Sequence, residues 1–306
     1  MVFDMHSSKI EKSLKINRVG VSGVRKPVTI MRADRVIQLS TTMDVFLDLP
    51  SDQRGSHLSR NLEVLTEIID ETVRIPGSGL EYISAKIAER LLEKHSYATY
   101  TEVYMIADYY LERGIDDTKK SLEPYKIIAT AKAYRNNNDI ERHIGVEVIG
   151  ISACPCAQDT IREEYTKRYP HFKEMIETVP MPTHNQRVRT TVLIQVPENK
   201  EIEADKIIEL IEKTFSSPTY AILKRIDEAT IVDNAHRNPR FVEDIVRETL
   251  LNIIKMYTDF PDNTKIYIKT ESEESIHKHN AFAETETTFG DVRKLNTNNI
   301  TANKRR

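Results

Sequence analysis

A regular alternation of polar and apolar residues runs through residues 28–49, VTIMRADRVIQLSTTMDVFLDL, which are rich in β-branched and aromatic side chains. Such alternation is typical of strands with one buried face, so it predicts two strands or one long bent hairpin. Two helices are predicted next, because apolar residues recur at helical spacing in residues 62–73 and again in residues 80–92. Ser78 and Glu81, three residues apart, predict a capping box at the start of the second helix.

The second half of the chain shows the same order of elements as the first. Two extended segments complete the first half, at residues 98–111 and 125–135. The second half has strand patterns at residues 140–152 and 187–196, a helix at 204–215, a helix starting at Asn238, and strands at 265–270 and 281–288. Asn238 and Pro239 predict the N-cap and first residue of that last helix, which is expected to bury Phe241 and Ile245.

Together these elements predict an α+β fold with antiparallel sheets, built from two tandem β-β-α-α-β-β units. A seam near Asn136-Asn137-Asn138 divides the chain into an N-terminal unit, residues 1–137, and a C-terminal unit, residues 138–295. Residues 296–306 are polar and non-periodic, so a frayed tail is expected there. The alternative is one irregular α+β domain whose element order matches by chance.

Composition limits the classes of protein to which the chain can belong. Its 306 residues include 44 Lys and Arg against 47 Asp and Glu, a formal net charge of −3. No basic excess is available to neutralise phosphates, which argues against a nucleic-acid binder. Residues 1–20 contain no apolar run of signal-peptide length, and no stretch has ~18 consecutive apolar residues. We therefore expect a cytoplasmic protein with neither nucleic acid nor a membrane as partner.

The two cysteines of the chain, Cys154 and Cys156, lie one residue apart in Ile151-Ser152-Ala153-Cys154-Pro155-Cys156-Ala157-Gln158. They are too few and too close for a disulfide framework, which indicates a reducing compartment. The motif follows an apolar strand and precedes a helical pattern. Pro155 sends the two thiols in different directions, so that one could bind a metal while the other packs. The alternative is a pair of buried thiols with no ligand.

Three of the nine histidines lie next to predicted strands. His184 directly precedes a strand, and His277 and His279 flank Lys278 just before another. One thiolate and two imidazoles would suit Zn²⁺ or Fe²⁺ and leave a position open for water. The alternative for the His-Lys-His stretch is an exposed loop. The other six histidines are in polar stretches and are expected at the surface: His6, His57, His95, His143, His171 and His236.

An open metal site of this kind generates a hydroxide near neutral pH, because the metal lowers the pKa of bound water to about 7. A spare histidine could then move protons in the same pH range. The residues alone therefore indicate a metal-assisted hydrolase or lyase, and they do not name its substrate.

These residues resemble the GTP cyclohydrolases of type IB, in particular the archaeal branch that begins methanopterin and archaeal pterin synthesis. The resemblance spans most of the chain in matching order. Its motifs are Gly20-Val21-Ser22-Gly23-Val24-Arg25-Lys26-Pro27-Val28, Gly55-Ser56-His57-Leu58-Ser59-Arg60, the Ser-x-Cys-Pro-Cys strand end, His184-Asn185-Gln186-Arg187, residues 220–228 (YAILKRIDE), residues 238–247 (NPRFVEDIVR) and Glu274-Ser275-Ile276-His277-Lys278-His279.

The resemblance implies a bimodular tunnelling fold whose subunits assemble into a barrel, a homotetramer with active sites at the subunit interfaces. It implies that the guanine imidazole ring of GTP is opened, C8 is lost as formate, and a 7,8-dihydroneopterin phosphate is formed. For the archaeal branch the implied product is the 2′,3′-cyclic phosphate and the implied metal is Fe(II), with Zn(II) or Mn(II) as alternatives. Bacterial relatives make the triphosphate.

The resemblance also assigns roles to individual residues. It makes Cys154 the metal-binding thiolate, His184 a second ligand and His277 the third ligand, with His279 as proton donor or alternative ligand. Glu274 resembles the acid that grips the purine edge, where a carboxylate accepting two N–H groups makes a strong bidentate pair. The alternative for Glu274 is a place in the solvated run of residues 271–274.

Arginines within the motifs are the expected partners of the triphosphate: Arg25, Arg60 and Arg187. Each could instead be an ordinary surface charge. Bacterial members have an acidic residue near the metal where this chain has Ser216-Ser217-Pro218, so a carboxylate ligand from that place is in doubt. A charged helical insertion at residues 162–178 supports the archaeal branch.

Two other functions remain open from the sequence. The first is another tunnelling-fold enzyme that acts on a pterin or a purine with a metal. The second is a non-catalytic nucleotide-binding protein in which the cysteines are only buried. Retention of the Cys154 thiol together with the His277 and His279 pair is the sequence feature that decides between a GTP cyclohydrolase and the first of these alternatives.

Overall fold

The computed structural model describes residues 13–32, 35–137 and 139–295. The predicted tail, residues 296–306, lies outside the described residues, as does His6. The chain forms two compact units. Unit 1 is drawn from Met1–Tyr109, Lys126–Gly145 and Gln195–Ile202, and unit 2 from Tyr110–Tyr125, Val146–Ile194 and Glu203–Arg306. The tandem division into residues 1–137 and 138–295 stays a prediction.

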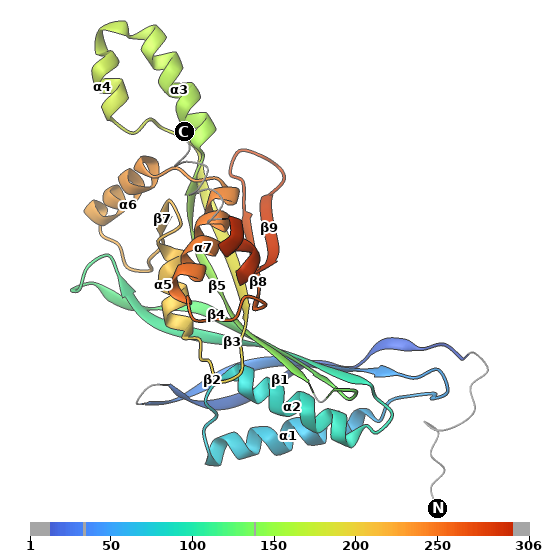
Figure 1. Cartoon of the computed structure of the whole chain (residues 1–306). Helices are drawn as coiled ribbons and strands as arrows, with labels where there is room; N and C mark the ends of the chain where they lie inside the picture. The colour runs from blue at the N-terminus through green and yellow to red at the C-terminus, as the bar shows by residue number, and fades with distance from the viewer. Residues whose placement is uncertain (1–12, 33–34, 138, 296–306) are drawn as a thin grey trace, which may run out of the picture. The chain divides into compact units, whose positions relative to one another are not determined.

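The elements follow the predicted order closely (Figure 1). The first half comprises β1 (Ile16–Arg32), β2 (Arg35–Leu49), α1 (Leu58–Arg74), α2 (Leu80–Lys94), β3 (Tyr100–Gly114) and β4 (Lys120–Tyr134). The second half comprises β5 (Ile140–Ala153), α3 (Pro155–Arg168), the short 3₁₀ helix η2 (Pro170–Phe172), α4 (Lys173–Thr178), β6 (Asn185–Gln195), α5 (Ala204–Glu212), β7 (Ser217–Pro218), α6 (Arg225–Arg237), α7 (Val242–Met256), β8 (Lys265–Ser272) and β9 (Ala281–Thr288).

The strands are hydrogen-bonded in the order β1-β2-β3-β4-β5-β6-β8-β9, with β7 pairing β5. The pairs β1–β2, β2–β3, β5–β7, β6–β8 and β8–β9 are all antiparallel. Strands β1 and β2 form the predicted hairpin, in which Arg32 lies opposite Arg35, but β1 begins at Ile16, twelve residues before the predicted stretch, and Ile16 lies opposite Leu49. The α+β fold class with antiparallel strands is therefore confirmed.

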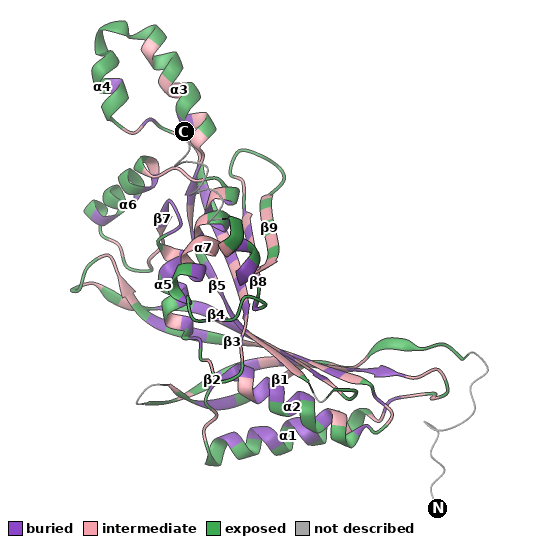
Figure 2. Cartoon of the chain, viewed as in Figure 1, coloured by how far each residue is buried: buried purple, intermediate pink, exposed green. Residues whose placement is uncertain are grey.

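The core of unit 1 lies between the β1–β2 hairpin and two helices. Met43, Val45 and Leu47 of β2 point to one face and are fully buried, as the alternation predicts. Helices α1 and α2 lie side by side over the hairpin and bury Leu65 and Ile87 against it (Figure 1). Figure 2 shows that their outward faces are exposed. Each helix is therefore held by one apolar stripe.

The predicted capping box of α2 is wrong, because Gly79 and not Ser78 is the N-cap, and no side chain caps the helix. The reason is the place of Glu81, which is buried and packs directly over Gly79. A Cβ on Gly79 would lie 2.5 Å from Glu81 Oε2. The cap position therefore requires a residue without a side chain.

The core of unit 2 lies between the sheet and helices α5 and α7. Helix α7 packs against β8 and β9 and also against α5. Buried isoleucines fill this contact, among them Ile207 of α5, Ile245 of α7 and Ile268 of β8. Helices α3 and α4 form a hairpin that extends beyond the end of the strands (Figure 1). This hairpin contains the predicted charged insertion and is mostly exposed.

The predicted start of the last helix is also wrong. Asn238 ends helix α6, which the sequence did not predict, and α7 begins at Val242 with Phe241 as its N-cap. Asn238 lies three residues before the N-cap of α7 and does not cap it; its Nδ2 donates instead to the carbonyl of Phe215 at 3.0 Å. Phe241 is 40% exposed, whereas Ile245 is fully buried as expected.

Candidate functional site

Cys154 lies at the junction of β5 and α3, where it is the N-cap residue of the helix. Pro155 occupies the first helical position, which suits its fixed φ and missing N–H. The two thiols differ in exposure: Cys154 is half-buried, whereas Cys156 is exposed on the first turn of α3, so it does not pack as predicted and the alternative of two buried thiols is also wrong. Cys154 is therefore the thiol that can face a site.

The backbone before Cys154 is held from two sides. Ser152 Oγ donates to the carbonyl of Arg240 at 2.9 Å, and Arg240 N donates to the carbonyl of Ala153 at 3.0 Å. Ala153 N donates in turn to Ser216 Oγ at 3.0 Å. Ser216 therefore fixes the end of β5.

The backbones of Cys154 and His184 are directly hydrogen-bonded, although the two residues are far apart in sequence. Cys154 N donates to the carbonyl of His184 at 3.1 Å, and Thr183 Oγ1 donates to the carbonyl of Cys154 at 2.8 Å. Strands β5 and β6 are neighbours in the sheet, so the end of one meets the start of the other. The structure thus brings together the first two predicted metal ligands.

Gln158, on the first turns of α3, fastens the segment that leads to His184. Its side chain is 4% exposed, and its Nε2 donates to the carbonyl of Met181 at 3.0 Å and to that of His236 at 2.6 Å. His236 Nε2 also lies 3.2 Å from the carbonyl of Thr183. These contacts hold α3, α6 and the chain before β6 in one arrangement.

Glu274 reaches the same place from the end of β8. Val188 of β6 pairs with Ser272 of β8, and the pairing extends one step further because Glu273 N donates to the carbonyl of Arg187 at 2.9 Å. The Glu274 side chain is 12% exposed, and its Oε2 lies 3.7 Å from His184 Nδ1. The alternative of a solvated position for Glu274 therefore does not hold.

A residue without a predicted role connects these side chains. Gln186 Oε1 lies 2.9 Å from His184 Nδ1, and Gln186 Nε2 donates to Glu274 Oε1 at 3.3 Å. Ser272 Oγ donates to the same carboxylate oxygen at 2.8 Å. The sequence could have indicated a role for Gln186 through its spacing from His184, because residues i and i+2 of a strand point to the same face.

His277 and His279 lie in the bend between β8 and β9 and are both exposed. The two rings are stacked with their centroids 5.1 Å apart, and the His277 ring meets the His184 ring edge-on at 6.3 Å. The predicted pair thus lies on one side of the chain, next to His184. The backbone of this stretch is bent and exposed, as in the alternative of an exposed loop, even though the rings lie next to His184.

The chemistry of these donors fits a borderline metal ion. A thiolate and two imidazoles are ligands of zinc and iron, and Cys154, His184 and His277 come from adjacent chain segments. Among residues 13–32, 35–137 and 139–295, however, no three His, Cys, Asp or Glu side chains converge closely enough to hold a metal ion. The chain segments that carry the three predicted ligands are therefore neighbours, but the ligand side chains do not lie at coordination distance from one common point.

The predicted phosphate-binding arginines are dispersed over the two units. Arg187 is exposed on β6, directly after Gln186, and belongs to the same unit as Cys154. Arg25 is exposed on β1, and Arg60 lies on α1 with its Nη1 3.4 Å from the carbonyl of Lys94. Arg25 and Arg60 belong to unit 1, whereas Cys154 belongs to unit 2.

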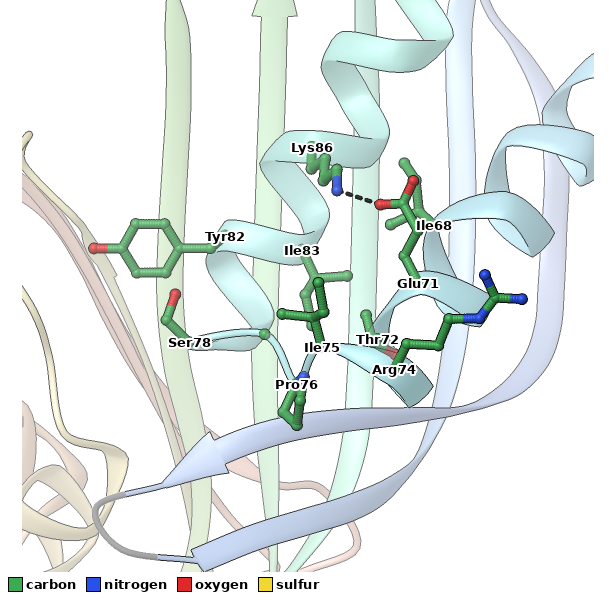
Figure 3. A pocket seen from close by; sticks show the side chains of 11 residues that line it. Ile68, Glu71, Thr72, Arg74, Ile75, Pro76, Ser78, Tyr82, Ile83 and Lys86 are labelled. Carbon is green, nitrogen blue, oxygen red and sulfur yellow. Dashed lines mark hydrogen bonds and ion pairs between the residues drawn. The ribbon is translucent and has the colours of Figure 1, made fainter.

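Two cavities are relevant to the choice of site. A cavity of 420 Å³ in unit 1, between the end of α1 and the start of α2, has apolar walls and the Lys86–Glu71 ion pair at its side (Figure 3). It contains none of the predicted site residues. A cavity of 640 Å³ in unit 2 lies between α6 and residues 180–182, the chain that leads to His184. Its lining also contains none of the predicted site residues, although residues 180–182 directly precede Thr183 and His184.

His95 corrects a prediction, because it is fully buried and not at the surface. Its Nε2 lies 2.7 Å from Asn61 Oδ1 and its Nδ1 lies 2.8 Å from Tyr97 Oη. Burial lowers the pKa of His95 to about 4, and the nearby Arg60 and His57 act in the same direction. The neutral ring thus forms part of the core of unit 1, beneath the Gly55–Arg60 motif.

No helix within the described residues is both long and apolar enough to cross a membrane.

Solved structures of low sequence identity share the fold. The chain matches a uricase from Bacillus fastidious with a TM-score of 0.51 and 12% identity, covering 93% of this chain and 96% of that one. A highly active mutant of the urate oxidase from Bacillus sp. TB-90 also gives 0.51, at 11% identity, covering 89% and 100%. These similarities place the chain in the tunnelling-fold class of mixed α+β proteins.

Sequence comparison defines the family within that class. The family model described as "Type I GTP cyclohydrolase folE2" matches residues 2–283. A protein named GTP cyclohydrolase MptA from Methanobrevibacter smithii is 42% identical over 291 residues, covering 92% of this chain and 94% of the relative. The protein of the same name from Methanosarcina mazei is 41% identical over 305 residues, covering 95% and 96%. The chain therefore belongs to the type I GTP cyclohydrolase family of the folE2 kind.

Proposed function

We propose that this chain opens the imidazole ring of GTP, releases C8 as formate and forms a 7,8-dihydroneopterin phosphate, the first step of pterin and methanopterin synthesis. The observation that carries the proposal is the meeting of Cys154, His184 and Glu274 at the ends of three strands, in a chain of this family. The high identity to archaeal relatives named MptA supports the 2′,3′-cyclic phosphate as the product.

The metal of the proposal is Fe(II), with Zn(II) or Mn(II) as alternatives, and Cys154, His184 and His277 would hold it. When bound, such a metal supplies an activated water for addition to C8. In this proposal His279, which stacks on His277, carries a proton to N7 of the purine. Proton delivery to N7 helps the carbon–nitrogen bond to break.

Glu274 orients the purine in this proposal. Its Oε1 is already fixed by Ser272 and Gln186, whereas Oε2 faces His184 at 3.7 Å. A carboxylate has about four lone-pair sites, so it can still accept from the guanine N1–H and 2-amino groups. Arg187, Arg25 and Arg60 would neutralise the triphosphate.

We also propose that the chain forms a homo-oligomer, namely a tetramer whose active sites lie at the interfaces between subunits. Within the described residues, β9 pairs only with β8, and β1 pairs with β2 and makes one further bridge, from Ile30 to Gly77. Unpaired strand edges are templates for pairing with another chain. A cytoplasmic location is part of the proposal, because a reducing compartment keeps the Cys154 thiol available as a ligand.

The test is anaerobic incubation of the full-length protein with GTP and Fe²⁺, followed by measurement of formate and of the fluorescence of the oxidised pterin. We expect both signals and about one tightly bound metal ion per subunit. Formate without a pterin, or neither signal after metal reconstitution, would overturn the proposal. Metal binding without formate would favour another pterin or purine reaction, and no metal binding would favour a non-catalytic nucleotide-binding protein.

The two cysteines provide a matched pair of variants. Cys154→Ala should abolish formate release and lower the bound metal, because it removes a proposed ligand. Cys156→Ala should retain metal and part of the activity, because that thiol is exposed on α3. The reverse result would show that the wrong thiol has been assigned to the metal.

A further inference from the structure

Gln186 lies between His184, the proposed metal ligand, and Glu274, the carboxylate proposed to bind the purine. It is the second residue of β6, its side chain is buried, and it lies on the same face of the chain as His184. The register of β6 and β8 places it opposite Glu274. Its amide contacts both neighbours, at 2.9 Å and 3.3 Å.

The orientation of the Gln186 amide follows from its neighbours. Glu274 Oε1 accepts a hydrogen bond from Ser272 Oγ at 2.8 Å, and a carboxylate oxygen accepts hydrogen bonds and donates none. The amide nitrogen must therefore face Glu274 Oε1, and the amide oxygen must face His184. Ser275 Oγ, at 3.5 Å from the same amide oxygen, is a hydroxyl donor and agrees with this orientation. The reverse orientation would place two acceptor oxygens against each other.

The same chain of hydrogen bonds determines which nitrogen of His184 carries the proton. The amide oxygen accepts and cannot donate, so His184 Nδ1 must be the donor of the 2.9 Å contact. In a neutral imidazole the other nitrogen, Nε2, then has a free lone pair. The Glu274 carboxylate near Nδ1 favours the same tautomer, because negative charge attracts the N–H group.

We propose that Gln186 is a positioning residue that holds His184 in the Nδ1–H tautomer, so that Nε2 is presented as the ligand atom. Through the same amide, Gln186 holds Glu274 in place. One side chain thus fixes both the substrate-binding carboxylate of Glu274 and the metal-binding imidazole of His184. The assignment of Nε2 to a metal rests on the proposed function, whereas the tautomer itself does not.

The tautomer can be measured without metal or GTP. The full-length protein, labelled with ¹⁵N-histidine and freed of metal, is studied by long-range ¹H–¹⁵N correlation, and the His184 signals are assigned by their loss in His184→Gln. We expect the Nδ1–H pattern for His184 in the unmodified protein. A predominant Nε2–H pattern would overturn the inference whatever the activity of the enzyme.

Two substitutions separate the two roles of the amide. Gln186→Leu removes both contacts, so His184 should lose its tautomer preference and the KM for GTP should rise. Zn²⁺ binding should weaken by about 10- to 100-fold, the range typical when a partner of a metal ligand is removed. Gln186→Glu still accepts from Nδ1–H but cannot donate to Glu274. It should keep the tautomer and most of the Zn²⁺ affinity, while the KM for GTP rises.

A control on the same strand accounts for general loss of stability. Thr190 is buried on β6 and its hydroxyl lies 2.9 Å from that of Thr270 on β8. Thr190→Val removes a bond between the same two strands away from His184, so it should leave the tautomer and the Zn²⁺ affinity unchanged. Equal effects of Thr190→Val and Gln186→Leu on both readouts would reduce Gln186 to a structural residue. The expected tautomer together with an absence of formate release would refute the proposed function alone.

Discussion

The buried histidine of unit 1 leads to a quantitative prediction about stability and pH. His95 has no exposed surface, and its two nitrogens are bonded to Asn61 and Tyr97. Burial, with the positive charges nearby, lowers its pKa from 6.5 to about 4. The unfolded chain therefore takes up a proton at a higher pH than the folded chain, and stability must fall as the pH falls from about 7 towards 4.

The size of the effect follows from the two pKa values. Each pH unit between them is worth about 1.4 kcal/mol, so the full loss of free energy of unfolding from His95 is about 3 kcal/mol. About 2 kcal/mol of it is lost between pH 7 and pH 5, because at pH 5 the unfolded histidine is almost fully protonated while the folded one is still neutral.

The assay compares urea unfolding of the unmodified protein and of His95→Gln at a series of pH values. Glutamine is neutral throughout, so titrations elsewhere in the chain cancel in the difference between the two proteins. That difference should shrink by about 2 kcal/mol from pH 7 to pH 5. His171 is exposed on η2, so His171→Gln should reproduce the pH profile of the unmodified protein. A His95→Gln difference that stays constant over this range would refute the reasoning.

Two further substitutions test other parts of the core. Burial raises the pKa of Glu81, so the ionised carboxylate costs stability at pH 7; Glu81→Gln should raise the free energy of unfolding there, with a gain that shrinks as the pH falls towards 4. A gain independent of pH would contradict this explanation. A Cβ on Gly150 would lie 2.0 Å from Phe215 Cδ2, so Gly150→Ala should destabilise the protein by about 1–3 kcal/mol. Combining it with Phe215→Leu should recover part of that loss in a double-mutant cycle, and strict additivity of the two changes would show that they do not clash.

Periodic patterns in the sequence predicted most of the secondary structure, because those patterns reflect burial directly. The alternation in residues 28–49 corresponds to β1 and β2, and the helical spacing in residues 80–92 corresponds to α2. Helix α6 was missed for the same reason. It buries only Asp227, Ile231 and Ala235 among its residues, too few to form an apolar stripe.

Errors at individual polar residues arose where tertiary contacts override the local pattern. His95 follows Glu93 and Lys94, a stretch that reads as surface, yet the chain turns inward after α2 and buries the ring against Asn61. Asn238 has a side chain typical of an N-cap, but its amide is used by a carbonyl from a distant segment. Neither partner can be identified from neighbouring residues in the sequence.

The residues of the candidate site were predicted from residue type and from the family resemblance. What brings them together is the pairing of strands in the sheet. In β5 the buried row Val146, Val148, Gly150 and Ser152 is followed, at the same spacing of two, by Cys154. In β6 the row Ile194, Val192, Thr190 and Val188 continues backwards to Gln186 and His184, and in β8 the row Ile266, Ile268, Thr270 and Ser272 continues to Glu274.

Each of these rows begins as hydrophobic core and ends in polar side chains, and the register of β6 and β8 brings two of the ends together. A slip of one residue would turn both a buried row and its functional end to the opposite face. The burial that stabilises unit 2 therefore also fixes which side chains meet at the site. Each row is visible in the sequence, but their common end is not, because it depends on pairing between strands that are distant along the chain.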